Sequence, residues 1–570
     1  MEPVLLIHGY SSEGRDLPEG ADVAGPTGEI YGDLPARLRR RYPDLEVAGV
    51  DMSRYTSLYD NVDLEDLTLA LDRVLHSDPY RGLLSTGFNA IIHSTGALVI
   101  RNWVRRCSPK PSPLRRVIHL AGANFGSGWA SVGESDLVKW GRLLFAGGTE
   151  RGIAVLEGLE LGSSFAIDLH RYFLEDGNNM LRDYGVMEFN IVGSQVSLGA
   201  AVHLPIRYGK EDGSDGVVRV CASNLNHHYI EIGPTPDADR DWEAAIAHAD
   251  QEADRLATIG RKLDDVTRAP GEAPGEGAAA EDEAARGGID ATYYGVLRDC
   301  RPADSMDSAA ALSVASPGPF THVRARTPFA IPYRTSHSGD DIGIVHGEQT
   351  KSEVDDLIDH AFACTRDAGG AVDLAAYEAA ARYYDGATSR TYETVLSQAH
   401  KDWFDRVLGE FIKPIQEQWQ NPPGQYDKHA QVIVRVRDHH GRPVRNCSVS
   451  FNSFGGGAEP HTMVNELIED THVNAGARGN CTFYLRTDAY QVRDGAAGWF
   501  PRIPDIKGLD LEIDSIDGSE DRIRFVPLRL RISEDQLSAW IRPHRTTILD
   551  VQLLRLPAAR TFLVVRAGQG

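Results

Sequence analysis

The sequence predicts an α/β fold with a mostly parallel, doubly wound sheet, followed by an antiparallel β-sandwich. Short apolar runs alternate with helical stretches through roughly the first 350 residues, which is typical of a parallel sheet. From about residue 428 the apolar residues recur with a period of two, which indicates strands with one buried face. We therefore expect three parts in this chain of 570 residues, at 1–350, 351–424 and 425–570.

The elements of the predicted sheet follow one another at short intervals along the first part. Strands are expected at 3–7, 45–51, 88–92, 116–121 and 186–192, and helices at 27–42, 62–76 and from 96 onward. In a sheet of this kind, ligands bind beyond the carboxyl ends of the strands. The catalytic and ligand-binding residues are therefore expected at that edge of the sheet.

Two insertions interrupt the first part. Residues 130–185 are helical and strongly apolar, and they lie between two expected strands, where they predict a cap or lid. Residues 239–325 begin as an amphipathic helix and continue into a stretch of mostly Ala, Gly, Pro and Glu, which indicates a helical and flexible insertion. Residues 351–424 are helical and are expected to pack on the first domain or to extend it. Binding, oligomerisation and stabilisation all stay open as roles of the β-sandwich.

Composition excludes several classes of function. The chain has 59 Lys and Arg against 82 Asp and Glu, a formal net charge of −23, which argues against nucleic acids and anionic membranes as partners. Its six cysteines form no C-x-x-C pair, so no zinc site is predicted and free thiols are expected, with a Cys447–Cys481 disulfide as the alternative. No metal or organic cofactor is expected.

The N-terminal residues carry no export signal that we recognise. Met1-Glu2-Pro3 lacks a basic region, the apolar run behind it is too short for a signal peptide, and no apolar run reaches transmembrane length. The expectation is a cytoplasmic protein. Export without a cleaved signal, as an effector, stays open, and the oligomeric state is not predicted.

The most informative stretch is a strand, an abrupt turn and a helix around Ser94. Ile91 and Ile92 suit a buried strand, and His93-Ser94-Thr95-Gly96 forms the turn. A serine in such a turn is lifted out of the sheet, and the positive end of the next helix points at it. The alternative is a serine that caps an ordinary buried helix.

This stretch resembles the nucleophile elbow of α/β-hydrolases, and more narrowly that of bacterial lipases and esterases. Ile92 stands where the usual G-x-S-x-G motif has its first glycine, and Gly96 keeps the second. The first expected strand ends in His8-Gly9-Tyr10, a second lipase-like feature. The resemblance implies that the backbone N–H groups of Tyr10 and Thr95 form the oxyanion hole, and that residues 130–185 cover a pocket for an apolar acyl group.

The same resemblance suggests the other two catalytic residues. Ser214-Asp215-Gly216 followed by two valines resembles the acid loop of bacterial lipases, with Asp215 as the acid and Asp212 as its rival. Ser336-His337-Ser338-Gly339 resembles the loop of the base, with His337 as the base. The alternatives to His337 are His346 and, less favoured, the pair His227-His228. The order Ser94, Asp215, His337 is the chain order of α/β-hydrolases.

Together these features predict a serine hydrolase that cleaves carboxylic esters with a hydrophobic acyl group, as a lipase or esterase does. The substrate is then a small-molecule or lipid ester, with transient contact to a lipid surface. Two alternatives stay open. One is a phospholipase or acyltransferase with the same triad. The other is a catalytically inactive hydrolase fold that serves binding or assembly, which the departure at Ile92 keeps open.

Overall fold

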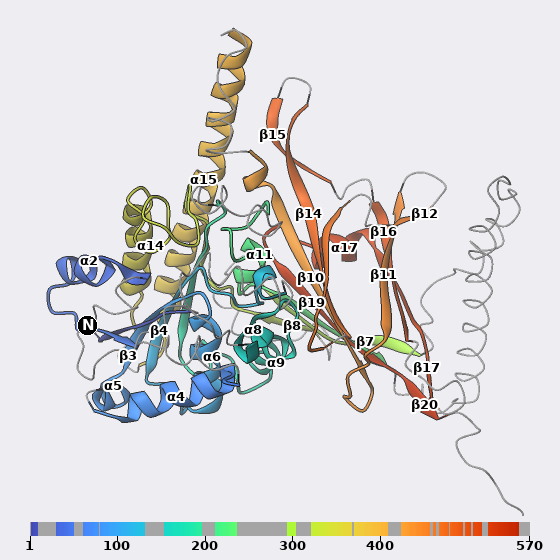
Figure 1. Ribbon diagram of the computed structural model, residues 1–570, viewed down its shortest axis with the longest axis horizontal. Coiled ribbons are helices and arrows are strands. Elements are labelled where there is room, and N and C mark those ends of the chain that lie inside the picture. Colours follow the sequence, from blue (N-terminus) through green and yellow to red (C-terminus); the bar gives the residue numbers. More distant parts are fainter. Residues whose placement is uncertain are drawn as a thin grey trace, which may run out of the picture.

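The parallel sheet forms from the short apolar runs of the first part. In the computed structural model of the protein, six strands lie in the order β2-β1-β3-β4-β5-β9, each parallel to its neighbours. This sheet, with β3 and β4, lies in the part of the molecule that carries the N-terminal end (Figure 1). The bounds of the six strands are β1 Val4–Ile7, β2 Val47–Val50, β3 Phe88–His93, β4 Leu114–Leu120, β5 Met187–Ile191 and β9 Phe329–Ala330. The predicted parallel, doubly wound sheet is confirmed.

The structure describes most, but not all, of the chain. The described residues are 2–9, 30–50, 61–78, 80–131, 153–196, 211–235, 293–303, 321–366, 370–408, 423–455, 460–462, 467–477, 479–493, 496–502, 506–515 and 523–557. The ranges leave out Tyr10, much of the predicted cap at 132–152, and residues 239–292 and 304–320 of the second insertion.

Helices cover both faces of the parallel sheet, because its strands are apolar on both sides. Leu5 and Ile7 of β1 face one helical layer and Val4 and Leu6 face the other. The first layer contains α4 Leu64–His76, α5 Arg81–Thr86, α6 Gly96–Arg106, α8 Ile153–Leu159 and α9 Ser164–Tyr172. The second contains α2 Leu34–Arg41, α14 Lys351–Ala363 and α15 Leu374–Leu408.

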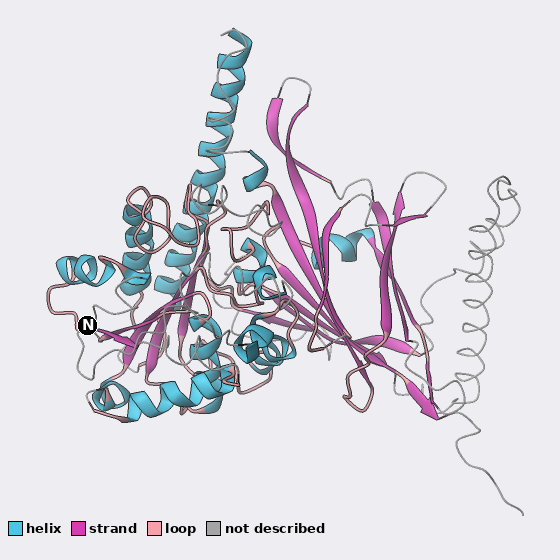
Figure 2. Cartoon of the chain, in the orientation of Figure 1, coloured by secondary structure: helices cyan, strands magenta, loops and turns pink. Residues whose placement is uncertain are grey.

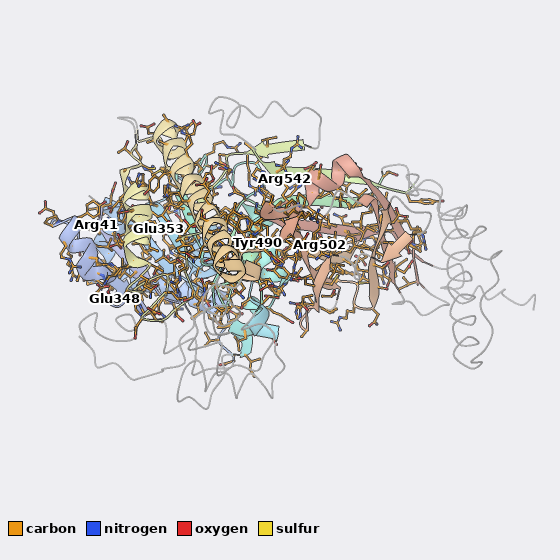
Figure 3. All side chains as sticks on the ribbon, turned by 90° about the horizontal axis from the view of Figure 1, so that it is seen from above. Arg41, Glu348, Glu353, Tyr490, Arg502 and Arg542 are labelled. Atoms are coloured by element: carbon orange, nitrogen blue, oxygen red, sulfur yellow. The ribbon has the colours of Figure 1, made fainter. Side chains whose placement is uncertain are left out.

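Within the region predicted as helical at 351–424, α14 and α15 pack on the parallel sheet. Of these two helices, α15 is 35 residues long and projects beyond the body of the molecule (Figure 1). Seen from above, Arg41 on α2 and Glu353 on α14 lie at one end of the molecule, while Arg502 lies over the β-rich part (Figure 3). In the described part of the chain, no helix is both long and apolar enough to cross a membrane.

The second part is built from β-sheets that pack face to face (Figure 2). The larger sheet has the order β13-β14-β10-β19-β6-β7-β8, with β15 paired to β14. Its strands are β6 His228–Pro234, β7 Tyr294–Pro302, β8 Thr321–Arg324, β10 Lys428–Asp438, β13 Ile468–Val473, β14 Asn480–Arg493, β15 Ala496–Pro501 and β19 Thr546–Leu553.

A smaller sheet in the order β12-β11-β16-β18 and a two-stranded pair complete this part. Their strands are β11 Cys447–Gly455, β12 Pro460–Thr462, β16 Ile506–Ser515, β17 Ile523–Phe525, β18 Leu528–Ser533 and β20 Arg555–Pro557. Short elements that link the sheets are η1 Gly128–Ser131, α11 Val220–Ser223, η3 Pro423–Tyr426 and α17 Glu534–Trp540.

Two details differ from the sequence prediction. The larger sheet is mixed rather than antiparallel, because β19 runs parallel to both of its neighbours, β10 and β6. Parallel neighbours need a long connection, and here more than a hundred residues separate β10 from β19. The stretch 239–325, predicted as helical and flexible, also contributes the strands β7 and β8. The predicted domain limits stay a prediction.

All six cysteines are free thiols, so Cys447 and Cys481 form no disulfide. Burial raises the pKa of the thiols of Cys221, Cys300, Cys364 and Cys481, which keeps them protonated at neutral pH. No cluster of His, Cys, Asp and Glu suited to a metal ion occurs among the residues that the structure describes.

A buried arginine joins the two parts of the molecule. Arg219 lies just before α11, and its guanidinium is 2.7 Å from Glu211 Oε1 and 2.6 Å from Asp470 Oδ2 of β13. All three side chains are at least nine-tenths buried. The ring of Tyr484 on β14 packs against the same guanidinium, 4.1 Å from its carbon, and the Tyr484 hydroxyl donates to Asp212 O at 2.6 Å. These contacts hold residues 211–219 against the second part.

Replacing Arg219 by methionine is expected to lower the free energy of unfolding by about 3–5 kcal/mol, because it leaves two buried carboxylates without their cation. Chemical denaturation of the two proteins measures the difference. Arg382→Met is the matched control, since its pair with Glu378 is mostly exposed and is worth about 1 kcal/mol or less. Equal losses in both variants would contradict the special role of Arg219.

Candidate active site

Ser94 lies in a sharp turn between β3 and α6. Its φ is +54°, which places a non-glycine residue in the left-handed region. His93 and Thr95 on either side are buried, whereas Ser94 is partly exposed. Because L-residues rarely adopt this conformation without a functional reason, the turn has the geometry of a nucleophile elbow. The first turn of α6 points its N–H groups toward this region.

Two glycines allow the backbone to close around this turn. A Cβ atom on Gly9 would lie 2.7 Å from the Cβ of Ser94 and 2.9 Å from the N of Thr95. One on Gly96 would lie 2.8 Å from the O of Ile7. Ile92, which replaces the first glycine of the usual motif, is fully buried in the core between the sheet and α6. Gly9 and Gly96 therefore provide the close approaches at this turn.

Asp215 and His337 form a buried hydrogen-bonded pair. His337 Nδ1 lies 2.9 Å from Asp215 Oδ2. The other carboxylate oxygen of Asp215 accepts from the backbone N of Val217 at 2.9 Å and of Val218 at 2.7 Å. The His337 N also donates to Asp215 O at 3.0 Å. The carboxylate is thus fixed by two N–H donors, and it holds the imidazole with its proton on Nδ1.

His93 connects this pair to the serine turn, and sequence reasoning did not single it out. Its ring centroid lies 4.6 Å from that of His337, and its Nε2 donates to His337 O at 3.1 Å. Burial, together with the nearby His337, holds the pKa of His93 well below its usual range, so the ring is neutral. The sequence signal that could have pointed to His93 is its position next to Ser94. Its hydrogen-bond partner, His337, lies 244 residues further along the chain, so the local pattern does not reveal the contact.

The loop of His337 follows β9, the last strand of the parallel sheet, as predicted. Its start packs against the chain that leaves β5: Gln195 N donates to Thr335 O at 3.0 Å. A Cβ on Gly193 would lie 2.1 Å from Thr335 O, so only glycine fits at that position. The carboxyl ends of β3, β5 and β9 therefore bring the serine turn and the histidine loop to one edge of the sheet.

The structure places the rival residues elsewhere. Asp212 faces Arg486 and Gln425, and burial raises the pKa of its carboxyl group. His346 Nδ1 donates to Ile30 O. His227 packs against the ring of Phe125, and His228 pairs with Asp299. Each of them thus has partners away from the Asp215–His337 pair.

The backbone N of Thr95 is the described part of the predicted oxyanion hole. Thr95 is the last residue before α6 and is almost fully buried. The approach of Gly9 to its N places the loop after β1 against the turn, as the resemblance implies. Tyr10, the second predicted donor, lies outside the described residues.

Gly9→Ala is expected to lower the rate of ester hydrolysis by at least about a hundredfold, because the added methyl pushes the loop away from Ser94 and Thr95 by an ångström or so. Steady-state kinetics measures the loss. Gly82→Ala is the control, because a Cβ there meets nothing within 4 Å. A Gly9→Ala protein as active as Gly82→Ala would contradict this close approach.

Comparison with known proteins gives matches only at the level of structure. No protein-family model and no curated protein matches the chain. Phospholipase PlaB from Legionella pneumophila matches with a TM-score of 0.65 at 19% identity, over 99% of this chain and 96% of that one. The structure of PlaB in complex with thio-NAD matches with a TM-score of 0.63 at 18% identity, again over 99% and 96%.

A lipase from Bacillus licheniformis, BlEst2 in its propeptide form, matches more weakly, with a TM-score of 0.28 at 16% identity over 40% of this chain and 44% of that one. The likeness to PlaB, in contrast, spans both the parallel sheet and the β-rich part. The chain therefore has an α/β-hydrolase fold followed by a β-rich part, an architecture that it shares with PlaB.

Proposed function

We propose that the chain is a lipolytic serine hydrolase and, more narrowly, a phospholipase that cleaves a carboxylic ester bond. The observation that supports it most is the 2.9 Å hydrogen bond between His337 and Asp215, beside a serine with φ of +54° in a strand-to-helix turn. The likeness of nearly the whole chain to a phospholipase favours this substrate class over the lipase or esterase expected from the sequence.

In the proposed mechanism, Ser94 Oγ attacks the ester carbonyl while His337 Nε2 accepts the hydroxyl proton. The Thr95 N–H donates to the oxyanion that forms, together with the N–H of Tyr10. His337 then gives its proton to the leaving alcohol oxygen, and the acyl group stays on Ser94. Water attacks this ester, His337 takes the proton of the water, and the fatty acid leaves as Ser94 regains its proton.

The role of Asp215 in this mechanism is positioning and charge. Its carboxylate keeps the His337 proton on Nδ1, so that Nε2 is free to accept the proton of Ser94. It also stabilises the imidazolium that forms in each step. His93 acts as a positioning residue, since its neutral ring donates a hydrogen bond to the backbone O of His337. This contact does not use the imidazole of His337, which stays available for the substrate.

The test is a comparison of substrates with the full-length protein. Phosphatidylcholine in mixed micelles, a triacylglycerol emulsion and p-nitrophenyl esters are incubated in parallel, and mass spectrometry identifies the products. We expect a fatty acid and a lysophospholipid from phosphatidylcholine, together with covalent labelling of the protein by a fluorophosphonate.

Each other outcome contradicts a defined part of the proposal. If fatty acid is released only from triacylglycerol or p-nitrophenyl esters, the protein is a lipase or esterase and not a phospholipase. An acyl product on an added alcohol, without free fatty acid, would indicate an acyltransferase. Neither turnover nor labelling would support an inactive hydrolase fold.

A further inference from the structure

A cavity lined by charged groups lies at the edge of the parallel sheet, away from the Asp215–His337 pair. The edge strand β9 pairs with β5 over only two residues, so the first half of β5 is paired with β4 alone and has no strand on its other side among the described residues. The cavity lies beside this half, between α6, α9, β5 and β8. It leaves about 50 Å³ open to the centres of water molecules, enough for several waters or one small ion.

The polar side chains around this cavity carry an excess of positive charge. Arg101 Nε lies 3.1 Å from Glu188 Oε1, so this pair is balanced. Arg324 has no carboxylate within ion-pair distance among the described residues, and donates instead to the carbonyl oxygens of Leu225 and His227. Two guanidinium groups therefore face one carboxylate.

The histidines around the cavity do not alter this balance. Burial holds the pKa of His170 and His227 well below the usual range, so both rings are neutral. Burial lowers the pKa of Arg324 to about 10, which still leaves its guanidinium charged at neutral pH. The cavity thus has a formal charge of about +1, because two arginines outweigh one glutamate.

One buried donor in the wall, Arg324 Nη1, has no hydrogen-bond partner among the described residues, and neither has the ring nitrogen His227 Nε2. The other ring nitrogen, His227 Nδ1, lies 3.0 Å from Arg324 Nη2 and 3.0 Å from Leu225 O, so it already has partners. A buried guanidinium N–H without a partner is rare in folded proteins, and beside an unbalanced cation it indicates an acceptor with negative charge.

We infer that this cavity binds a phosphate-type oxyanion through Arg324 and Arg101. A guanidinium presents parallel N–H groups that match two oxygens of such an ion, which water does not offer. Arg324 is partly exposed, which gives the ion a path from solvent. The ion is either free phosphate or the end of a phosphate ester, because both present the same oxygens.

The site is distinct from the proposed catalytic residues. Arg101 follows Ser94 by seven residues, which is about 10 Å along α6. Glu188 lies near the start of β5, at the opposite end from the histidine loop. A bound anion would lie between α6, β5 and β8. Because it would bind only the folded chain, it would stabilise that state by mass action.

The experiment measures binding in the Ser94→Ala full-length protein, so that it does not depend on hydrolysis. Isothermal calorimetry and thermal unfolding follow the addition of sodium phosphate, with sodium chloride at the same ionic strength as reference. We expect saturable binding of one phosphate and a rise in Tm that chloride does not produce. Arg324→Gln is expected to weaken binding at least about tenfold, and Arg324→Lys to weaken it less.

Arg326→Gln is the matched control, since Arg326 is two residues away, pairs with Asp385 and does not line the cavity. It should bind phosphate like the parent protein. Equal stabilisation of all variants would indicate a general salt effect and overturn the inference, as would the absence of binding of inorganic phosphate, glycerol 3-phosphate and the phosphatidic acid vesicles alike.

If Arg324→Gln fails to fold, Arg324→Lys replaces it, and unchanged phosphate affinity in that variant overturns the inference. Glycerol 3-phosphate and vesicles that contain phosphatidic acid, tested in parallel, distinguish the sources of the oxyanion. Binding of inorganic phosphate supports a free ion. Binding of the ester or the vesicles without inorganic phosphate supports the end group of a phosphate ester.

Discussion

Ser94→Ala is expected to lower kcat for ester hydrolysis by about a millionfold, the size of loss seen when a serine hydrolase loses its nucleophile. The substitution removes only the oxygen that bonds to the acyl group. Alanine keeps the Cβ of serine and adds no atom at φ of +54°, so the turn should keep its shape and the Tm should stay within a few degrees. Kinetics on the preferred ester, fluorophosphonate labelling and thermal unfolding measure the three effects.

Ser85→Ala serves as the control for this experiment. Ser85 is an exposed serine on α5 whose hydroxyl donates to Gly82 O, so its loss should change neither labelling nor turnover. Full activity in Ser94→Ala would show that another residue attacks the ester. An inactive variant with a much lower Tm would instead show that Ser94 has a structural role, as a helix-capping serine would.

The elements around the serine were predictable because their signals are local. An apolar strand, a turn with Gly96 and an amphipathic helix occupy adjacent residues, and both their order and their burial follow from that pattern. The distant partner loops were found by resemblance to lipases, and the order along the chain restricted the choice. Sequence reasoning favoured Asp215 but kept Asp212 as its rival, because the two differ by three positions in one glycine-rich loop. Their difference arises from the packing of β14, since Tyr484 and Arg486 hold Asp212 away from the histidine.

The mixed character of the second sheet was not predictable for a related reason. A strand such as Tyr229-Ile230-Glu231-Ile232 has the same alternation whether its neighbour runs parallel or antiparallel. Its partner on β19 lies more than three hundred residues further along the chain. Thr546 on β19 donates to Cys221 O, six residues after Asp215, at 2.8 Å. The β-rich part therefore supports the loop that carries Asp215, which the sequence alone left without an assigned role.

Asp215→Asn is expected to lower kcat by about ten-thousandfold with little change in KM, because the amide reverses the tautomer of His337. The Oδ1 of asparagine can still accept from the N–H groups of Val217 and Val218. Its NH₂ group must then face His337 Nδ1, and since it donates, Nδ1 becomes an acceptor. The proton moves to Nε2, which can no longer take the proton of Ser94. The loss thus arises from the direction of one hydrogen bond in an unchanged fold.

Asp212→Asn separates this explanation from a general effect of charge. The residue lies in the same loop and carries the same group, but its partners are Gln425 and Arg486 of the domain junction. We expect its kcat to stay within a fewfold of the parent and its Tm to fall slightly. A reversed result, with Asp212→Asn inactive and Asp215→Asn active, would make Asp212 the acid and would mean that the 2.9 Å contact to His337 is only structural. Both variants replace an aspartate by asparagine in the same loop, but Asp215 contacts His337 whereas Asp212 contacts Gln425 and Arg486. Kinetics and Tm of the two variants, measured side by side, therefore distinguish a catalytic acid from a structural one.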